Sequence, residues 1–314
     1  MKVLATTSHS VFALDCNTGD ARVVHRGAGL YFGIARVGTG YAVAARRRLV
    51  SSAVSREAER GCVLLVDAHF ASCETVEAPF PLRDMHQIAW FDDRLFVTCS
   101  FDDAIAVFDG AGWERWTPQL PPDVAARRSR SDAEHDRYHY NSFLLLDDEF
   151  ALLAHNHGPS NVDFFDRRSR SFRRTLSLGV QAHNLWYEGD RLWTCSSIEG
   201  RLVADDGEAI ATGGFPRGVA FGGPARAFGL SALSERGQRD FASAAIALCD
   251  AAWRPRHYVY LPHEGMILDL LPLEDAEFEA VRRSALAPVA LPIVGELDPA
   301  DLAADQGSGA DASR

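Results

Sequence analysis

Histidine is the residue type whose placement in this 314-residue sequence most suggests chemistry. His86, His139 and His183 each stand at or just before the start of an aliphatic and aromatic segment that is typical of a β-strand. Imidazole nitrogens are good ligands for Zn, Fe, Mn or Cu, so histidines that meet at one point would form a divalent transition-metal site. We therefore take these three residues as candidate metal ligands.

A second group of polar residues lies close to these histidines or at matching positions, and its members are candidates for binding a substrate: Asn141, Asn184, His155, His157, Arg217 and His263. The guanidinium of Arg217 would orient an anionic group of the substrate, and a bound metal would polarise a carbonyl or activate a water molecule. Two other interpretations stay open. The histidines would line a metal-free pocket for a small anion, or they would only bond to neighbouring backbone.

The elements that would position these residues repeat along the chain. An apolar segment ends in aspartate six times, at Asp15, Asp67, Asp109, Asp166, Asp205 and Asp250. The intervals of 39 to 57 residues fit four-stranded propeller blades, which take about 40–50 residues each. Each carboxylate would accept backbone N–H groups of the turn that follows. The sequence therefore predicts an all-β fold, a six-bladed β-propeller.

The order of strands within a blade follows from the pairs of segments that precede each aspartate. The strand that ends in Asp is the third of its blade, and segments such as "HQIAW" and "RLFVTCS" supply the first and second. The N-terminus supplies only a second, third and fourth strand, so residues 265–273, "GMILDLLPL", are expected to close the ring as the missing first strand. Residues 1–291 would form this single domain, and the acidic residues 292–314 a disordered tail.

One face of such a propeller would collect the polar candidates. The start of every first strand and the end of every second strand lie on the same face, and at least seven of the eleven histidines map there. His86, Asn141 and His183 are equivalent, each eight residues before the start of a second strand. The long loops 46–61, 117–138 and 234–242 map to this face too. We interpret residues 46–48 as a solvated arginine loop, with an anion clamp as the alternative, and residues 127–137 as a flexible charged loop, with a lid over the rim as the alternative.

Composition excludes several classes of protein. The net charge of −11 argues against a nucleic-acid partner, and no stretch approaches the ~20 apolar residues of a membrane span. Lys2 is the only lysine, so a phosphate-binding lysine of the Walker type and a buried Schiff-base lysine are absent; no nucleotide-cofactor motif is found, nor an HExxH, GxSxG or CxxC motif. No leader peptide is evident, and the six cysteines favour a cytoplasmic protein with reduced thiols.

Three segments in the second half carry a resemblance to a known family: "AHNLWYEGDRLW", "GGFPRGVAFGGPARAFGLSALSER" and "HEGMILDLLPLE". They resemble, over roughly residues 181–273, the signatures of an uncharacterised bacterial family of six-bladed β-propellers. The matching residues are His183 and Pro216 to Gly218, with Leu230, Ser231 and Arg236 less closely matched. The resemblance implies a propeller whose rim is built around His183 and Arg217. It implies no reaction.

Two functions follow as hypotheses. The first is a cytosolic propeller enzyme that uses a histidine-rich site, with or without a divalent metal, on a small anionic substrate. The sequence does not separate hydrolase, lyase and oxygenase chemistry. The second is a non-catalytic propeller whose long loops bind a ligand or a partner protein.

Overall fold

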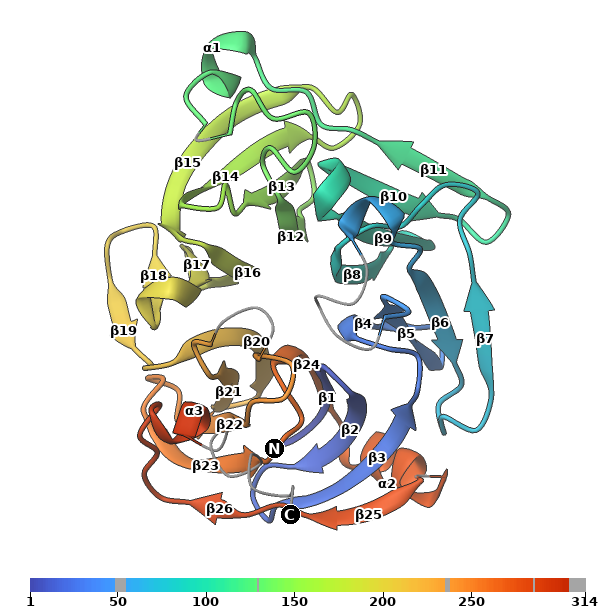
Figure 1. Cartoon of the computed structure of the whole chain (residues 1–314), viewed down its shortest axis with the longest axis vertical. Helices are drawn as coiled ribbons and strands as arrows, with labels where there is room; N and C mark the ends of the chain where they lie inside the picture. The colour runs from blue at the N-terminus through green and yellow to red at the C-terminus, as the bar shows by residue number, and fades with distance from the viewer. Residues whose placement is uncertain (49–54, 129, 235–237, 285, 305–314) are drawn as a thin grey trace, which may run out of the picture.

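Six antiparallel sheets are arranged in a ring in the computed structural model, which describes residues 1–48, 55–128, 130–234, 238–284 and 286–304 (Figure 1). The prediction of a six-bladed β-propeller is confirmed. The first strand of each blade lies nearest the central axis, and the fourth lies on the outside (Figure 1). No helix in the described part of the chain is long and apolar enough to cross a membrane.

The strands of blades 1 to 3 follow the predicted order from the axis outward. Blade 1 contains β24 (Ile267–Leu273), β1 (Lys2–Thr7), β2 (Ser10–Asp15) and β3 (Asp20–Arg26). Blade 2 contains β4 (Tyr31–Val37), β5 (Gly40–Ala45), β6 (Cys62–Val66) and β7 (Cys73–Val76). Blade 3 contains β8 (Met85–Phe91), β9 (Arg94–Cys99), β10 (Ala104–Phe108) and β11 (Trp113–Trp116). Short 3-10 helices η1 (Arg56–Ala58) and η2 (Ser100–Asp102) follow β5 and β9.

Blades 4 to 6 repeat the arrangement. Blade 4 contains β12 (Tyr140–Leu145), β13 (Glu149–Ala154), β14 (Pro159–Asp166) and β15 (Phe172–Val180), and α1 (Pro122–Ala125) lies in the loop before it. Blade 5 contains β16 (Ala182–Glu188), β17 (Arg191–Ser196), β18 (Arg201–Ala204) and β19 (Ala209–Ala211), with η3 (Ser197–Glu199) after β17. Blade 6 contains β20 (Phe215–Gly222), β21 (Ala225–Ser231), β22 (Ala244–Cys249) and β23 (Pro255–Leu261).

The ring is closed as predicted, by a strand from the far end of the chain. β24 pairs with β1 from Lys2 opposite Leu273 to Thr6 opposite Asp269. The turn aspartates also behave as expected. Asp15 accepts the backbone N–H of Asn17, and Asp67, Asp109, Asp166 and Asp250 accept N–H groups of their own turns. The sixth, Asp205, accepts instead from Leu192 on a neighbouring strand.

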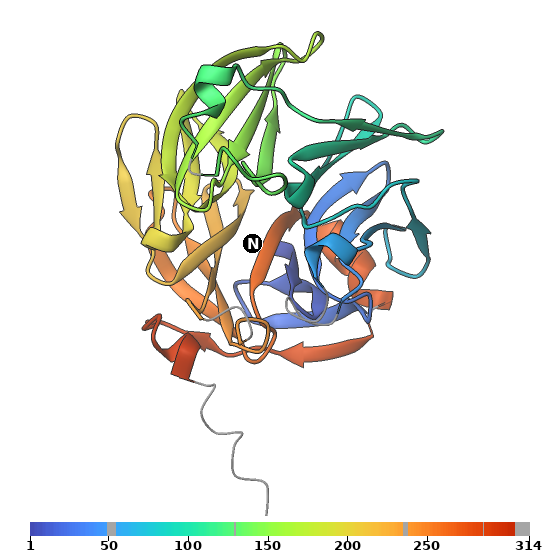
Figure 2. The same cartoon turned by 45° about the horizontal axis from the view of Figure 1, so that its top comes forward.

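The C-terminal segment departs from the prediction. After α2 (Asp275–Ser284), β25 (Ala287–Ala290) adds a fifth strand to blade 1, and β26 (Ile293–Val294) adds one to blade 6 (Figures 1 and 2). In α3 (Asp301–Ala304), Leu302 is fully buried in the apolar cluster that contains Trp253. The predicted disordered tail is therefore wrong for residues 292–304, and residues 305–314 lie outside the described part of the chain.

Neighbouring blades are joined through one equivalent position of each first strand. All six first strands contain a β-bulge near this point, which directs two successive residues to different surroundings. We call the residues at the joining position the latch residues: Gly33, Gln87, Ser142, Asn184, Gly218 and Asp269. The residues just before them are the channel residues: Phe32, His86, Asn141, His183, Arg217 and Leu268.

Four latch side chains accept a backbone N–H group from the next blade. The acceptor–donor pairs are Gln87 Oε1 with Phe143 N at 2.7 Å, Ser142 Oγ with Asn184 N at 2.8 Å, Asn184 Oδ1 with Gly218 N at 2.8 Å and Asp269 Oδ2 with Ile34 N at 3.1 Å. The other two latch residues are glycines because the next blade comes too close for a side chain. A Cβ on Gly33 would lie 2.5 Å from the backbone nitrogen of Ile88.

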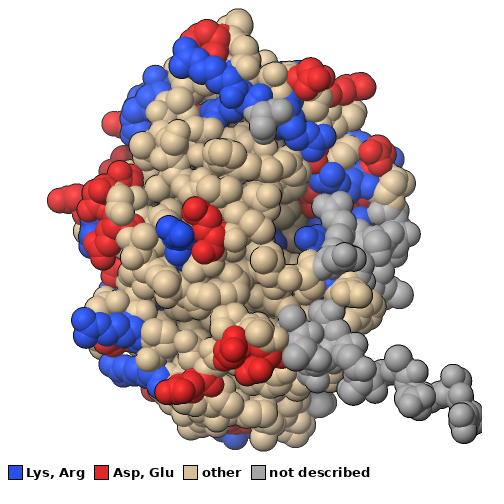
Figure 3. Space-filling model, turned by 60° about the vertical axis from the view of Figure 1, so that its left-hand side comes forward, with Lys and Arg blue, Asp and Glu red and all other residues tan. Residues whose placement is uncertain are grey.

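Charged residues on the outer surface are interspersed rather than segregated. On the face shown in Figure 3, acidic and basic side chains alternate and are separated by uncharged residues. Pairs such as Arg170 with Glu114 and Arg174 with Glu149 bring opposite charges together on blades 3 and 4.

Candidate functional site

A cavity of about 290 Å³ lies where the first strands begin, and channel residues from five blades line it. These are Phe32, His86, His183, Arg217 and Leu268. Blade 4 is the exception, since the amide of Asn141 instead donates to the carbonyl of Ala182 at 2.8 Å. This blade contributes His139 from the loop before β12, and His155 and His157 from the end of β13.

Five imidazoles form one cluster in this cavity. The ring centroids of His86, His139, His155 and His183 make a closed circuit with successive separations of 5.0, 4.9, 5.3 and 5.9 Å. His157 adds a fifth ring, 4.9 Å from His139. The fold thus brings together the three residues predicted as metal ligands and two of those predicted to bind substrate.

A buried carboxylate fixes the orientation of His139. Its Nδ1 lies 2.6 Å from Asp136 Oδ1, and because an ionised carboxylate only accepts, Nδ1 carries the proton. Burial opposes ionisation of Asp136, but hydrogen bonds from His139 and His157 outweigh it and hold the pKa of this carboxyl far below its usual value. In the neutral ring the lone pair of His139 is therefore on Nε2, which makes Nε2 a proton acceptor or a ligand atom.

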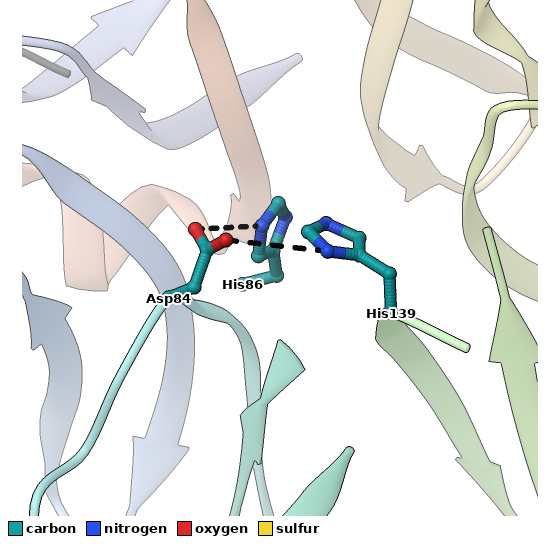
Figure 4. A group of neighbouring side chains, drawn as sticks. All are labelled: Asp84, His86 and His139. Atoms are coloured by element: carbon teal, nitrogen blue, oxygen red, sulfur yellow. Dashed lines mark ion pairs between the residues drawn. The ribbon is translucent and has the colours of Figure 1, made fainter. Parts of the chain in front are cut away.

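His86 has the opposite tautomer. Arg217 Nη2 donates to His86 Nδ1 at 2.6 Å, so the ring proton is on Nε2, 3.3 Å from Asp84 Oδ1 (Figure 4). Burial, followed by the charge of Arg217, lowers the pKa of His86 well below its usual value and keeps it neutral. Both nitrogens of His86 are thus engaged by protein groups.

The remaining two buried rings also have defined tautomers. Ser197 donates its hydroxyl proton to the carbonyl of Pro216 at 2.8 Å and therefore accepts from His183 Nδ1 at 2.9 Å, which leaves the lone pair of His183 on Nε2. His155 Nδ1 accepts the backbone N–H of His157, so its proton is on Nε2. Burial is the main cause that lowers the pKa of both His155 and His183 well below the usual value. The cluster thus combines two acceptors, on His139 and His183, with a donor on His155.

Arginines and carboxylates pack behind the histidine cluster. Arg46 contacts both oxygens of Glu59, at 2.7 and 2.6 Å, and Asp84 at 2.6 Å. Arg56 links Asp84 at 3.1 Å to Asp136 at 2.7 Å. Because Asp84 and Asp136 are the carboxylates that contact His86 and His139, this network determines where those two imidazoles lie.

Two loop predictions are corrected by this network. Arg46 and Arg48 are buried against Glu59, so the interpretation of residues 46–48 as a solvated loop is wrong for both. In the segment 127–137, Arg128 is buried against Asp163, and Asp136 is only 1% exposed, so these residues are not part of a flexible charged loop. Residues 49–54 and 129 lie outside the described part of the chain.

The charge of Arg217 is not compensated by a carboxylate among the described residues. Arg217 is 5% exposed, its one hydrogen bond to a described residue is to the neutral His86, and no described carboxylate lies within ion-pairing distance of it. The guanidinium also lies 5.1 Å from the centroid of the Phe32 ring. Burial, and then the charge of Arg239, lowers the pKa of Arg217 to about 9, which still leaves it a cation at neutral pH.

Two sets of residues in the described part of the chain could hold a metal ion. They are Asp84 with His86 and His139, and Asp136 with His139 and His157; in each set the candidate ligand atoms lie within 4.8 Å of one another. His183 belongs to neither. The predicted combination of His86, His139 and His183 is not one of these two sets, and it stays a prediction.

Three predicted substrate-binding residues lie outside the cavity. Asn141 and Asn184 bond to the backbone of the next blade, and His263 lines a separate shallow pocket with His9, Arg26 and Glu264. The sequence analysis did not identify the two carboxylates that contact His86 and His139. Asp84 is two residues before His86 and Asp136 is three residues before His139, and this close spacing was the available signal.

Comparison with known proteins shows the fold. No family model and no curated protein matches the chain. A solved structure titled a nidogen/laminin complex matches with a TM-score of 0.60 and 12% identity, over 86% of this chain and 97% of that one. A streptogramin B lyase matches with a TM-score of 0.45 and 11% identity (79% and 70%), and virginiamycin B lyase from Staphylococcus aureus with 0.44 and 12% (74% and 69%). At these identities the likeness extends to the propeller fold alone.

Proposed function

We propose that this chain is an enzyme that binds a small anionic substrate through Arg217 in the central cavity and transfers protons with the histidine cluster. The observation that carries the proposal is a buried guanidinium whose one hydrogen bond, among the described residues, is to a neutral imidazole. A buried cation without a counter-charge costs free energy. A substrate carboxylate or phosphate would supply that charge through charge-assisted hydrogen bonds.

The charges around the cavity support an anion rather than a cation. The cavity lining and the network behind it contain the arginines Arg46, Arg48, Arg56, Arg217 and Arg239 and the carboxylates Glu59, Asp84, Asp136 and Asp240. Burial raises the pKa of Glu59 to about 7, which reduces the negative charge further. Unlike the mixed outer surface in Figure 3, the inner site has an excess of positive charge.

The histidine tautomers support acid–base chemistry on the bound anion. His139, oriented by Asp136, and His183, oriented by Ser197, each have a lone pair on Nε2. His155 has a proton on Nε2, and its ring centroid lies 4.9 Å from that of His139 and 5.3 Å from that of His183. A base and an acid that both contact one substrate can remove a proton and protonate a leaving group. This step is shared by lyases and hydrolases.

A metal-dependent form of the enzyme is a second candidate, favoured by the proximity of Asp84, His86 and His139. A divalent ion held there would supply Lewis-acid chemistry. For His86 to ligate such an ion through Nε2, its proton must leave that nitrogen, and Arg217 must release Nδ1. The ion would also add positive charge to a site that already has an excess. Both requirements favour the metal-free form.

The test begins with binding. Isothermal titration of the tag-free protein with acetate and with inorganic phosphate should show saturable binding of at least one anion, and Arg217→Gln should weaken it about 100-fold, as expected for a charge-assisted pair of ~3 kcal/mol. The matched control is Arg36→Gln, which removes an arginine that pairs with Glu277 outside the cavity. Equal affinity in the two variants would contradict the proposal.

Turnover and metal content then separate the candidates. The protein is incubated with a mixture of small carboxylates and phosphates, and products are followed by mass spectrometry. Conversion that is lost in His139→Gln and in His183→Gln while acetate binding is kept would support acid–base catalysis. Binding without any conversion would favour the non-catalytic module. Stoichiometric metal in the purified protein that disappears in Asp84→Asn would favour the metal-dependent enzyme.

A further inference from the structure

The imidazoles and most of the apolar side chains in the wall of the central cavity come from different blades. Blades 3, 4 and 5 contribute the five imidazoles. Blades 6, 1 and 2 and the segments that join their strands contribute the apolar side chains of Leu30, Phe32, Phe215, Leu233, Met266 and Leu268, with Arg46, Ser234, Arg239 and Asp240 beside them. We call these two surfaces the histidine wall and the apolar wall.

Arg217 lies at the boundary between the two walls. It comes from blade 6, which is opposite blade 3 in the ring, yet it donates to His86 of blade 3. Its guanidinium also lies near the ring of Phe32 in the apolar wall. An anion held by Arg217 would therefore have imidazoles on one side and apolar groups on the other.

The apolar surface continues from the buried end of the cavity to its opening. Phe32, Met266 and Leu268 are 5%, 6% and 4% exposed, whereas Leu233 is 60% exposed. Ile198, which follows β17, lines the same cavity and is 38% exposed. Exposed aliphatic side chains that border a cavity gain free energy when a ligand covers them.

We infer that the substrate is an organic acid with an apolar tail, bound with its carboxylate on Arg217 and its tail along the apolar wall toward Leu233 and Ile198. This inference rests on the proposed function. A monoanion matches Arg217, which has no carboxylate partner among the described residues, whereas Arg46 is already engaged by Glu59 and Asp84. Inorganic phosphate and polyhydroxylated acids would leave the apolar wall uncovered by any matching surface.

The position of Arg217 next to His86 also determines which part of the substrate lies beside the imidazoles. Arg217 bonds to His86, whose ring stacks 5.9 Å from that of His183. With the carboxylate on Arg217, the carbons next to it lie beside the histidine wall. The far end of the tail lies away from the imidazoles, so tail length changes affinity more than it changes proton transfer.

The test compares four probes by isothermal titration: acetate, hexanoate, hexanamide and gluconate. Wild-type protein should bind hexanoate at least tenfold more tightly than acetate or gluconate, because each buried CH₂ adds to affinity. Hexanamide should bind at least tenfold more weakly than hexanoate, because it has the tail without the charge. The expected ratios define the site as one for amphipathic carboxylates.

Variants assign the two ends of the probe. Leu233→Asn and Ile198→Asn should reduce hexanoate affinity at least threefold and leave acetate affinity unchanged. Both residues are exposed, so these variants should fold normally. Leu286→Asn is the control, because Leu286 is 68% exposed and does not line the cavity. The Arg217→Gln variant should bind both acetate and hexanoate far more weakly than the wild type does.

The outcomes distinguish this inference from the proposal beneath it. If acetate and hexanoate bind with equal affinity and Arg217→Gln weakens the binding of both, the apolar wall does not bind a tail, and the anion site at Arg217 still stands. Equal affinity for hexanoate and hexanamide would overturn the requirement for a carboxylate. If Arg217→Gln binds acetate as the wild type does, the proposed function itself fails.

Discussion

Two rows of residues run side by side around the channel and have different tasks. The channel residues differ in chemistry from blade to blade, and five of the six line the cavity. The latch residues, one position later, either accept a backbone N–H group from the next blade or are glycines in close contact with it. The β-bulge in each first strand separates the two rows.

The pseudo-sixfold symmetry is kept at the latch residues and lost at the channel residues. Assembly of the ring makes the same demand at every blade junction, so the latch position is limited to hydrogen-bond acceptors and glycine. The cavity makes no such repeated demand, and Phe32, His183 and Arg217 can occupy equivalent positions with unrelated side chains. Substitutions in the channel row should therefore change binding, and those in the latch row should change stability.

The largest expected effect is that of Arg217→Gln on its two observables. Affinity for acetate should fall about 100-fold, while the free energy of unfolding in anion-free buffer should stay the same or rise, because a buried unpaired cation is removed. Gln keeps an N–H donor for His86 Nδ1. Titration calorimetry and urea denaturation measure the two quantities. A loss of more than ~2 kcal/mol of stability would show that this arginine belongs with the assembly residues.

The next effect is on the pH dependence of stability and concerns the latch residue Asp269. Burial raises the pKa of this carboxyl to about 6 in the folded protein, against about 3.9 in an unfolded chain. The folded state thus binds the proton more tightly, so the contribution of Asp269 to stability is fully present below pH 3.9 and is lost as the pH rises through 6.

Asp269→Asn removes this titration while keeping a side-chain oxygen for the N–H of Ile34. Between pH 4 and pH 7 the wild type should lose stability relative to the variant by an amount on the order of 3 kcal/mol, the equivalent of about two pKa units. Burial lowers the pKa values of His86, His155 and His183, so these residues destabilise the fold as the pH falls below 6.5. Their effect is the same in the wild type and in Asp269→Asn. A difference that does not change with pH would refute the prediction.

A smaller effect is expected for Gln87→Leu. The variant leaves the backbone N–H of Phe143 without its acceptor, which costs about 1–3 kcal/mol of unfolding free energy. Acetate affinity should not change. Gln87→Glu keeps an acceptor and serves as the control in the same urea titrations. Weaker acetate binding in Gln87→Leu with unchanged stability would remove the distinction between the rows.

The smallest effect concerns the exception in blade 4. Asn141 occupies a channel position but bonds to the carbonyl of Ala182, so Asn141→Ala should behave like a latch substitution. We expect a loss of about 1 kcal/mol in stability and unchanged affinity for acetate. Reduced affinity for acetate with unchanged stability would show that Asn141 acts in binding, as the other channel residues do.

Much of the fold could be predicted because the same local sequence patterns recur in each blade. The turn aspartates define six third strands, and the spacing before the second strands makes His86, Asn141 and His183 equivalent. Register alone did not reveal that Asn184 is a latch residue, because the bulge that separates it from His183 depends on pairing with β17.

The missed features depend on contacts between residues far apart in the sequence. Arg46 looked solvated within three successive arginines, and its burial depends on Glu59 and Asp84. In the sequence, Asp136 lies within a charged segment. In the structure it contacts His139, His157 and Arg56. In the C-terminal segment, the few apolar residues that pack on blade 6, such as Leu302, make no periodic pattern.

The most direct test of the account is a crystal structure of the protein with 6-bromohexanoate, in which carboxylate density and the anomalous signal of bromine locate the two ends of one molecule. We predict the carboxylate on the guanidinium of Arg217 and a single bromine peak beside Leu233 and Ile198. A carboxylate bound elsewhere, or a bromine peak among the imidazoles, would contradict the account.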